Sequence, residues 1–277
     1  MNETVKIWTD LSESDLNSAR LLYDNGHFRT SYFFFQQATE KANKAFALLS
    51  GLLSDKELKD IQHDQLKIYR KTIVKQESEI KSLIEVLKPY PKITNHELIQ
   101  KTNFVKYHSS LSEGLSFIDS LRNIDLVNVS TNDLNTIIRE LKKLKQTKLK
   151  FPKDIKQVFK KQFLEVADWI GHFETQESLK EKNDLINLLD NEEQSKQFYD
   201  LMIYQILPMI IEIAFANMTL FFCALITVQH SSMTRYPENN INPETVYNLQ
   251  LPIVKKQPLF MDLLKNSIIV IKKLNEA

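Results

Sequence analysis

Four glycines, eight prolines and one cysteine are all that this 277-residue sequence contains of the residues that form tight turns and cross-links. Two-residue hairpins depend on glycine, so its scarcity disfavours a β-rich fold, whereas abundant leucine, lysine and glutamate favour long helices. The same scarcity excludes a glycine-rich loop of the kind that cradles phosphate. The lone cysteine, Cys223, lies in an apolar segment without a disulfide partner, so we expect it to be buried. We therefore predict an all-α protein.

The chain also lacks an excess of charge of either sign. Its 36 Lys and Arg residues face 35 Asp and Glu residues, and this net charge of +1 gives no overall field that attracts nucleic acid. Locally, lysines cluster between Lys142 and Lys161. We interpret this run as a solvated helix face, and the alternative is a contact to RNA or phosphate.

Long hydrophobic runs are scarce, and only Leu201–Gln229 approaches the hydrophobicity of a membrane span. Gln205, Pro208 and Glu212 interrupt it, and a carboxylate near the middle of a bilayer is costly, so we expect a buried core helix. The first ten residues carry an early glutamate and lack the apolar run of a secretory signal. We therefore expect a cytoplasmic protein with no membrane partner.

The most informative segment that is present is Tyr32–Gly51, which reads YFFFQQATEKANKAFALLSG. Steps of three and four residues place one apolar stripe on a helix, formed by Phe35, Ala38, Ala42, Ala45 and Leu49. The alanines let a neighbouring backbone approach closely. Glu40 can pair with Lys44 at the i, i+4 spacing on the polar border. We expect this helix to start at Thr30 or Ser31 and to reach Gly51.

Turn and cap residues mark other helix ends. Ser12–Asp15 resembles a capping box and predicts the start of the first helix, and Asn25–Gly26 predicts its end. Pro89–Tyr90–Pro91 indicates a boundary. Other prolines are expected in the first turn of a helix at Pro152, at a kink in the apolar helix at Pro208, and before the final helix at Pro258. Helical periodicity also covers 96–122 and 130–145, whereas 174–183 looks like an exposed connection or a short solvated helix.

The pattern predicts three segments along the chain. Residues 1–88 form the first part of a helical bundle, residues 89–190 form a helical insertion or subdomain, and residues 191–277 supply the closing helices.

Four short motifs occur in a fixed order: ARLLYDNGHF at Ala19–Phe28, FQQATEKANKAF at Phe35–Phe46, His63-Asp64-x-Leu66, and Thr234–Pro237. Together they resemble the HEPN domain family. The resemblance implies an up-and-down four-helix bundle, commonly a homodimer, from bacterial defence, toxin–antitoxin or nucleotide-processing systems. It covers about half of the chain at its two ends. The region from about Lys71 to Gln197 has no counterpart in the minimal family and reads as an inserted helical subdomain.

Many HEPN proteins resemble metal-independent ribonucleases that carry an arginine, about four to six intervening residues and then a histidine, so that one group holds phosphate and the other moves a proton. Here Arg20 and His27 have that spacing but straddle a turn, and His230 precedes Arg235 in reversed order. His108 follows Asn103 at a related spacing without the arginine. We interpret each pair as structural, with ribonuclease action by a displaced Arg/His pair as the alternative.

Nucleotide or RNA binding fits the resemblance better. Arg235 offers a guanidinium for phosphate and Tyr236 offers a ring for a base. If the bundle closes as in the family, His63, Lys41 and Lys44 line the same cleft. The competing interpretations are a helix-end loop for Arg235–Pro237 and a solvated helix edge for the two lysines.

The resemblance also implies partners. These are a nucleotide or RNA, a nucleotidyltransferase or antitoxin protein, and a second copy of the chain that meets the aromatic Tyr32–Phe35 face. A purely protein-binding helical scaffold is a further alternative. The sequence has no zinc-type motif, and its six histidines are scattered along the chain, so we expect no metal and no cofactor. They lie at positions 27, 63, 96, 108, 172 and 230.

Overall fold

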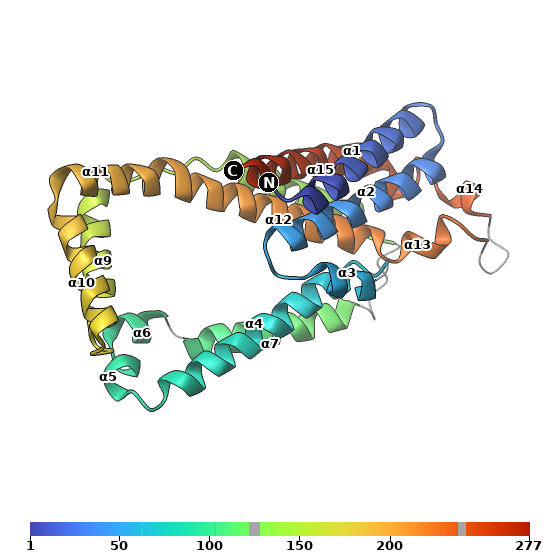
Figure 1. Ribbon diagram of the computed structural model, residues 1–277. Coiled ribbons are helices and arrows are strands. Elements are labelled where there is room, and N and C mark those ends of the chain that lie inside the picture. Colours follow the sequence, from blue (N-terminus) through green and yellow to red (C-terminus); the bar gives the residue numbers. More distant parts are fainter. Residues whose placement is uncertain (62, 103, 122–127, 238–241) are drawn as a thin grey trace. The chain divides into compact units, whose positions relative to one another are not determined.

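The computed structural model describes residues 1–61, 63–102, 104–121, 128–237 and 242–277 (Figure 1). Over these residues the regular structure is helical and contains no β-strand, which confirms the predicted all-α fold. The chain separates into two compact units. Unit 1 comprises Met1–Thr72, Phe117–Thr147 and Ile211–Ala277, and unit 2 comprises Ile73–Ser116 and Lys148–Ile210. The predicted segment limits at residues 89 and 190 stay a prediction.

The helices of the described residues divide between these units. Unit 1 holds α1 (Glu3–Asp24), α2 (Phe28–Leu49), α3 (Asp55–Ile61), the start of α4 (Leu66–Leu87), α8 (Thr131–Gln146), most of α12 (Leu207–Thr227), α13 (His230–Met233), α14 (Pro243–Val246) and α15 (Pro252–Glu276). Unit 2 holds the rest of α4, α5 (Pro91–Thr94), α6 (Glu97–Thr102), most of α7 (Phe104–Ser120), α9 (Ile155–Gly171), α10 (Gln176–Asp190), α11 (Glu192–Leu201) and a π-helical turn, η2 (Met202–Ile206).

Helix α1 begins earlier than its capping pattern predicted. The Asn2 side chain accepts the backbone N–H of Val5 at 3.3 Å and caps the helix there. Ser12 instead lies buried within α1 and donates its hydroxyl to the Ala38 carbonyl at 2.7 Å. The predicted start at Ser12 is wrong because the helix continues upstream of it. The predicted end is confirmed, since Asn25 caps the helix and Gly26 adopts φ +80°.

The apolar stripe of α2 is confirmed by burial. Phe35, Ala38, Ala42 and Ala45 are fully enclosed, and Leu49 is half-buried. The three alanines give α1 room to approach, as the bond from Ser12 to α2 shows. The helix starts at Phe28, two or three residues before the predicted start at Thr30 or Ser31. Figure 1 shows α1, α2 and α15 side by side.

Helices from the end of the chain close this bundle. The Tyr32 hydroxyl donates to the Ile226 carbonyl of α12 at 2.6 Å, and the Gln257 amide of α15 donates to the Ser31 hydroxyl at 2.8 Å. Cys223 of α12 is fully buried, as predicted, and burial raises the pKa of its thiol. Unit 1 is therefore a bundle of α1, α2, α12 and α15, with α8 packed against α15.

A buried polar cluster joins α2 to the start of α4 and to α12. The Tyr69 hydroxyl donates to Asn43 Oδ1 at 2.6 Å, and the Asn43 amide donates to the Thr39 carbonyl at 3.0 Å and to the Leu220 carbonyl at 3.3 Å. Gln65 Oε1 accepts a further bond from the same amide at 3.4 Å. Because buried polar groups need partners, these bonds fix how the three segments face one another.

The proline predictions had mixed outcomes. Pro89–Pro91 separates α4 from α5 as predicted. Pro258 lies inside α15, which begins at Pro252, so its predicted place before the final helix is wrong. Pro152 precedes α9 rather than lying in its first turn. Pro208 is the second residue of α12, two residues after the π-helical turn ends, and the wider coil of that turn makes room for a residue without an N–H.

Within the described residues, one helix, Glu192–Thr227, is long and apolar enough to cross a membrane by length and composition alone. Its most apolar window has a mean hydropathy of 2.1 and is 39% buried. Core helices of soluble proteins meet the same criteria. Glu212, in this helix, pairs with Lys273 of α15 at 2.7 Å. The expected cytoplasmic location stays a prediction.

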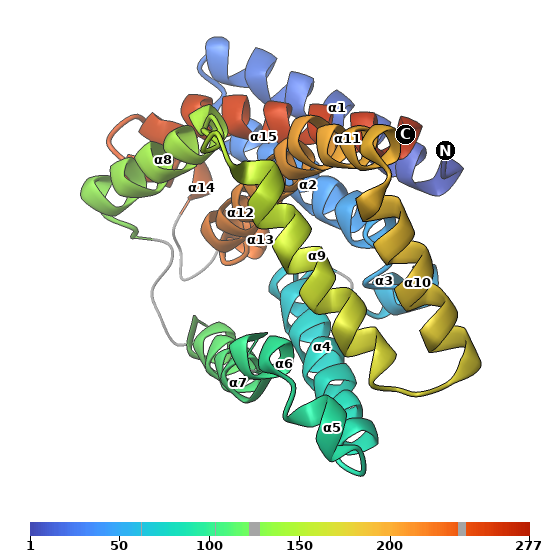
Figure 2. The ribbon, with the colours of Figure 1, turned by 90° about the vertical axis from the view of Figure 1, so that its left-hand side faces the viewer.

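Unit 2 contains a helical pair with its own apolar core. Helices α9 and α10 pack against each other (Figure 2), and Leu189, Tyr199 and Ile203 are buried among aromatic side chains of α9. Of the two interpretations of 174–183, the helix is confirmed and the connection is wrong, because α10 occupies most of the stretch behind the Thr175 cap. The predicted helix 96–122 is described as α6 and α7 on either side of residue 103.

Lysines of the basic run are ion-paired within unit 2. Lys156 bonds Asp200 at 2.9 Å, and Lys160 bonds Asp190 at 2.9 Å. This pairing supports the interpretation of a solvated, balanced helix face.

Candidate functional site

Arg235 and Tyr236 follow the short helix α13 in unit 1. The Arg235 guanidinium carbon lies 5.0 Å from the centre of the Phe33 ring on α2, and both Arg235 and Tyr236 are exposed, with Tyr236 at 61%. A guanidinium on a ring face keeps its edge N–H groups directed away from the ring. Among the described residues, no carboxylate or carbonyl is bonded to these N–H groups.

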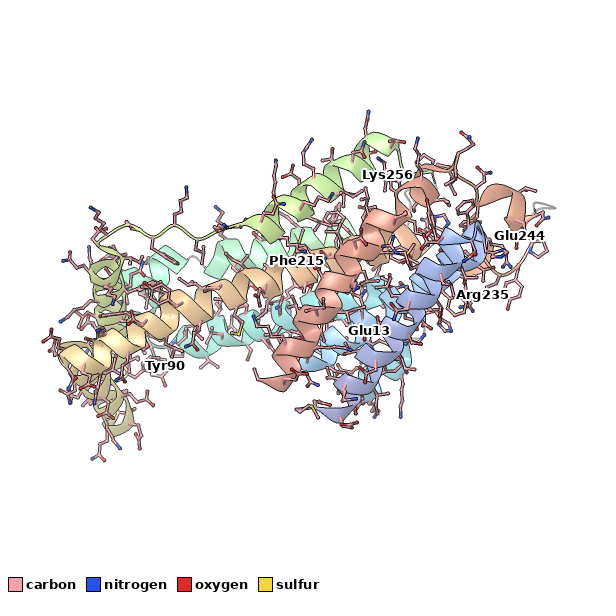
Figure 3. The ribbon with its side chains drawn as sticks, turned by 90° about the horizontal axis from the view of Figure 1, so that it is seen from above. Glu13, Tyr90, Phe215, Arg235, Glu244 and Lys256 are labelled. Atoms are coloured by element: carbon pink, nitrogen blue, oxygen red, sulfur yellow. The ribbon has the colours of Figure 1, made fainter. Side chains whose placement is uncertain are left out.

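The backbone before Arg235 is anchored to α2. Arg29 Nη1 donates to the Thr234 carbonyl at 2.6 Å, and Arg29 also pairs with Glu244 of α14. Thr234 itself is buried, and its hydroxyl donates to the His230 carbonyl at 3.0 Å. Figure 3 shows Arg235 and Glu244 at the same end of unit 1. Arg29 thus uses its donors within unit 1, whereas Arg235 makes no such bond to the described residues.

The lysines predicted for binding lie elsewhere on α2 and are neutralised. Lys44 Nζ bonds Glu40 Oε1 at 2.7 Å and lies 5.1 Å from the centre of the Trp8 ring. Lys41 pairs with Asp15 of α1. Both lysines therefore hold α2 against α1.

His63 joins the Lys44 pair from the segment after α3. Its Nδ1 lies 3.1 Å from Glu40 Oε2, and its side chain is 63% exposed. Glu40 is buried, and its two carboxylate oxygens contact Lys44 and His63 respectively. We name Glu40, Lys44 and His63 the Glu40 cluster.

The five residues predicted to bind nucleotide therefore form two groups. Phe33 and Lys44 are eleven residues apart on α2, a separation of about 16 Å along the helix axis. Arg235 and Tyr236 lie at the Phe33 end, and Lys41 and the Glu40 cluster lie further toward the C-terminal end of α2. One mononucleotide does not reach both groups, so the Phe33 end is the better candidate.

The arginine and histidine residues considered for catalysis lie in structural settings. Arg20 pairs with Asp262 and donates to the Pro258 carbonyl at 3.0 Å, while His27 is exposed at the start of α2. His108 lies 3.7 Å from Glu77 in unit 2, and Asn103 falls outside the described residues. In the described part of the chain, no contact joins Arg20 to His27.

His230 is enclosed rather than available to a substrate. It is 1% exposed, its Nδ1 lies 2.6 Å from the Tyr247 hydroxyl, and its ring centre lies 4.9 Å from that of Tyr32. This aromatic group packs at the junction of α2, α13 and α14. His230 is therefore part of the core, whereas Arg235 is exposed to solvent.

The aromatic face proposed for dimer contact also lies largely inside unit 1. Tyr32 and Phe35 are fully buried, and Phe34 packs against the same core. Phe33 is half-buried beneath Arg235.

Sequence reasoning missed Phe33 and Arg29 as parts of this end of α2. Their i, i+4 spacing on one helix face was a usable signal, because it places a cation and a ring side by side. Their link to Thr234 and Arg235, about two hundred residues later, had no local signal.

Unit 1 is thus an all-α bundle that presents an exposed arginine on an aromatic ring and is closed by helices from distant parts of the chain. A family model, that of the HEPN domain, matches residues 5–95, which include the first part of unit 1. This match supports the resemblance that the motifs indicated, and it covers about a third of the chain's length. The Thr234–Pro237 motif lies outside the match. No curated protein and no solved structure matches the chain.

Proposed function

We propose that this protein is a nucleotide- or RNA-associated HEPN module of a bacterial defence, toxin–antitoxin or stress system, without the usual ribonuclease motif. The HEPN match supports the class, since the family is associated with RNA-related and defence functions. The observation that carries the proposal is the exposed Arg235 guanidinium on Phe33, beside exposed Tyr236.

Phosphate is the natural ligand of such an arginine. A guanidinium donates two parallel N–H bonds to a phosphate group, and a ring beneath it limits the rotamers that must be frozen on binding. Arg29 keeps the backbone of this arginine in place through the Thr234 carbonyl. Tyr236 then offers a ring on which an unpaired base can stack.

Single-stranded RNA is the probe that uses both groups. A fluorescein-labelled oligouridine of about twelve nucleotides, titrated with the full-length protein, reports binding by anisotropy. Arg235→Ala should weaken binding roughly tenfold or more, because one charge-assisted bond to phosphate is lost. It should also reduce the slope of log K against log salt by about 0.7, the value for one phosphate contact on a single strand.

Arg139→Ala is the matched control, since Arg139 is an exposed arginine of unit 1 that pairs with its neighbour Glu140. It should leave both affinity and salt slope unchanged. Equal affinities for wild type and Arg235→Ala would overturn the assignment of this site. Loss of binding in both variants would indicate diffuse charge attraction instead.

The proposed partners are a nucleotidyltransferase or an antitoxin protein, and a second copy of the chain. Because Tyr32 and Phe35 are buried, a homodimer would have to use other residues. Gel analysis of the oligouridine after the titration addresses the ribonuclease alternative. We expect the RNA to remain intact, and cleavage that His27→Ala or His108→Ala abolished would overturn the non-catalytic proposal.

A further inference from the structure

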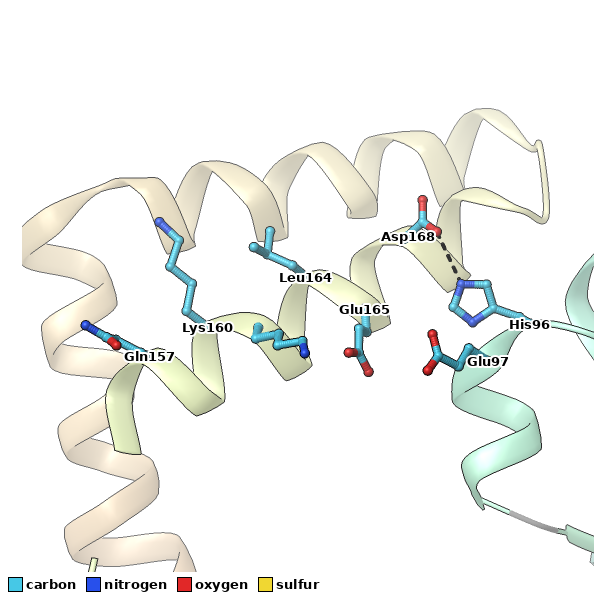
Figure 4. A pocket seen from close by; sticks show the side chains of 8 residues that line it. His96, Glu97, Gln157, Lys160, Leu164, Glu165 and Asp168 are labelled. Carbon is cyan, nitrogen blue, oxygen red and sulfur yellow. Dashed lines mark hydrogen bonds and ion pairs between the residues drawn. The ribbon is translucent and has the colours of Figure 1, made fainter. Parts of the chain in front are cut away.

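Two histidines that are far apart in the sequence meet in unit 2. His96 stands at the start of α6, and His172 caps the end of α9, one turn after Asp168. The fold places one ligand atom of each of these three residues within 4.8 Å of the other two. Figure 4 shows His96 directed at Asp168 across the cavity between α6 and α9.

The distances suit a shared ion. His96 Nε2 lies 3.2 Å from Asp168 Oδ2, close to the roughly 3.0–3.4 Å that separates two donors at about 2.1 Å from one zinc ion. His172 Nδ1 lies 2.8 Å from the Asp168 carbonyl. The same nitrogen lies 4.0 Å from Asp168 Oδ2. When Nδ1 donates its proton to the carbonyl, Nε2 keeps a lone pair for a metal ion, which is the usual arrangement of a metal-binding histidine.

We propose that His96, Asp168 and His172 bind one divalent transition-metal ion of the zinc class. Two imidazoles and one carboxylate are a donor set that zinc, cobalt and nickel accept, with solvent in a remaining position. The ion ties the start of α6 to the end of α9 within unit 2. This site is independent of Arg235 and of the proposed RNA contact.

The surroundings contribute charges of both signs. A cavity of about 540 Å³ adjoins His96 and Asp168, and Glu97 and Glu165 line it near His96 (Figure 4). Lys160 and Lys161 also line the cavity. The carboxylates add attraction for a cation near the ligands, while Lys160 is already paired with Asp190.

Two existing contacts of the proposed ligands oppose metal binding, and both must weaken or break when the ion binds. Lys182 Nζ lies 3.2 Å from Asp168 Oδ1 and partly neutralises the carboxylate. The Leu98 N–H bonds His96 Nδ1 at 3.2 Å, so the proton of neutral His96 lies on Nε2 in the metal-free state. Coordination through Nε2 moves that proton to Nδ1 and gives up the bond from Leu98.

Calorimetric titration of the full-length protein with zinc chloride tests the site. We expect one ion to bind, and His172→Gln and Asp168→Asn each to weaken binding at least about tenfold. His108→Gln and His63→Gln are the matched controls, because each of these histidines also lies beside a glutamate. Absence of binding, or affinity that His172→Gln and Asp168→Asn leave unchanged, would overturn the proposal.

Lys182→Gln gives a test of opposite sign. Removing the competing ammonium should tighten zinc binding several-fold, a gain that a misfolded variant does not produce. Cobalt substituted for zinc should show visible absorption bands that His172→Gln alters and His108→Gln preserves. Weaker or equal zinc binding by Lys182→Gln would count against a site centred on Asp168.

Discussion

The two ends of α2 present basic side chains in opposite ways. At the Phe33 end, Arg235 lies exposed on a ring, without a carboxylate partner among the described residues. At the other end, Lys44 shares the buried Glu40 with His63, and Lys41 is paired with Asp15. In the sequence all three are simply basic residues. The comparison teaches that the partner, rather than the residue type, decides whether a cation is available to a ligand.

The largest expected effect comes from breaking the Glu40 cluster. Glu40→Gln leaves the Lys44 ammonium, 11% exposed, without its counter-charge and removes the carboxylate from His63. We expect the free energy of unfolding to fall by about 3 kcal/mol, because an unpaired charge in a largely buried place is costly. Urea denaturation followed by circular dichroism measures this change.

Glu140→Gln provides the comparison for that measurement. Glu140 pairs with Lys143 at 3.0 Å on an exposed face of α8, and an exposed pair of this kind adds little stability. The denaturation midpoint should stay at the wild-type value. Similar midpoints for Glu40→Gln and Glu140→Gln would show that the Glu40 cluster is no more structural than a surface ion pair.

An intermediate effect is expected from Tyr32, next to Phe33. Burial raises the pKa of its phenol well above the ordinary value of 10.0. As the pH rises above about 10, the unfolded chain loses this proton while the folded chain keeps it, so stability falls by about 1.4 kcal/mol per pH unit. Below pH 10 the Tyr32 phenol is protonated in both the folded and the unfolded chain, so its full contribution to the free energy of unfolding is present.

Tyr32→Phe should therefore flatten the loss of stability between pH 10 and 11, measured by urea denaturation at each pH. The variant also loses the bond to the Ile226 carbonyl, which lowers stability by about 1 kcal/mol at every pH. Tyr236→Phe is the matched control at the same end of α2, because that ring is largely exposed. An unchanged slope in Tyr32→Phe would contradict the burial of this phenol as the cause.

The smallest effect on stability is expected at Arg235. An exposed cation–π contact contributes about 0.5–1 kcal/mol, so Arg235→Ala should lower the free energy of unfolding by no more than that. Its effect on RNA binding, in contrast, should be roughly tenfold. A stability loss as large as that of Glu40→Gln would place Arg235 among the structural cations and remove the contrast between the two ends.

Local periodicity made much of unit 1 predictable. The stripe from Phe35 to Ala45 followed from apolar spacing, and Asn25–Gly26 ended α1 where its chemistry indicated. Ser12 misled because a capping pattern inside a longer periodic run marks no start. Pro258 misled because a helix held on several sides tolerates the loss of one backbone bond.

Contacts between distant segments were not predictable. The motif order suggested that Arg235 belongs near α2, but the sequence did not reveal that Phe33, rather than Lys41 or Lys44, receives it. His96 and His172 looked scattered because seventy-five residues lie between them, and only the packing of unit 2 brings them together. Which distant residues meet depends on how each helix is rotated and shifted against its neighbours. A single sequence carries no direct signal of that rotation or shift.

The hydrogen bond from Tyr32 to Ile226 spans 194 residues and has a consequence for synthesis on the ribosome. Helices α1 and α2 can pair as soon as they emerge, because a short turn joins them. Their remaining apolar surface waits for α12 and α15, which at typical rates of translation arrive about 10 to 40 s later. During that interval the nascent chain exposes Tyr32 and Phe35 to solvent, so we expect a chaperone to bind this face of α2.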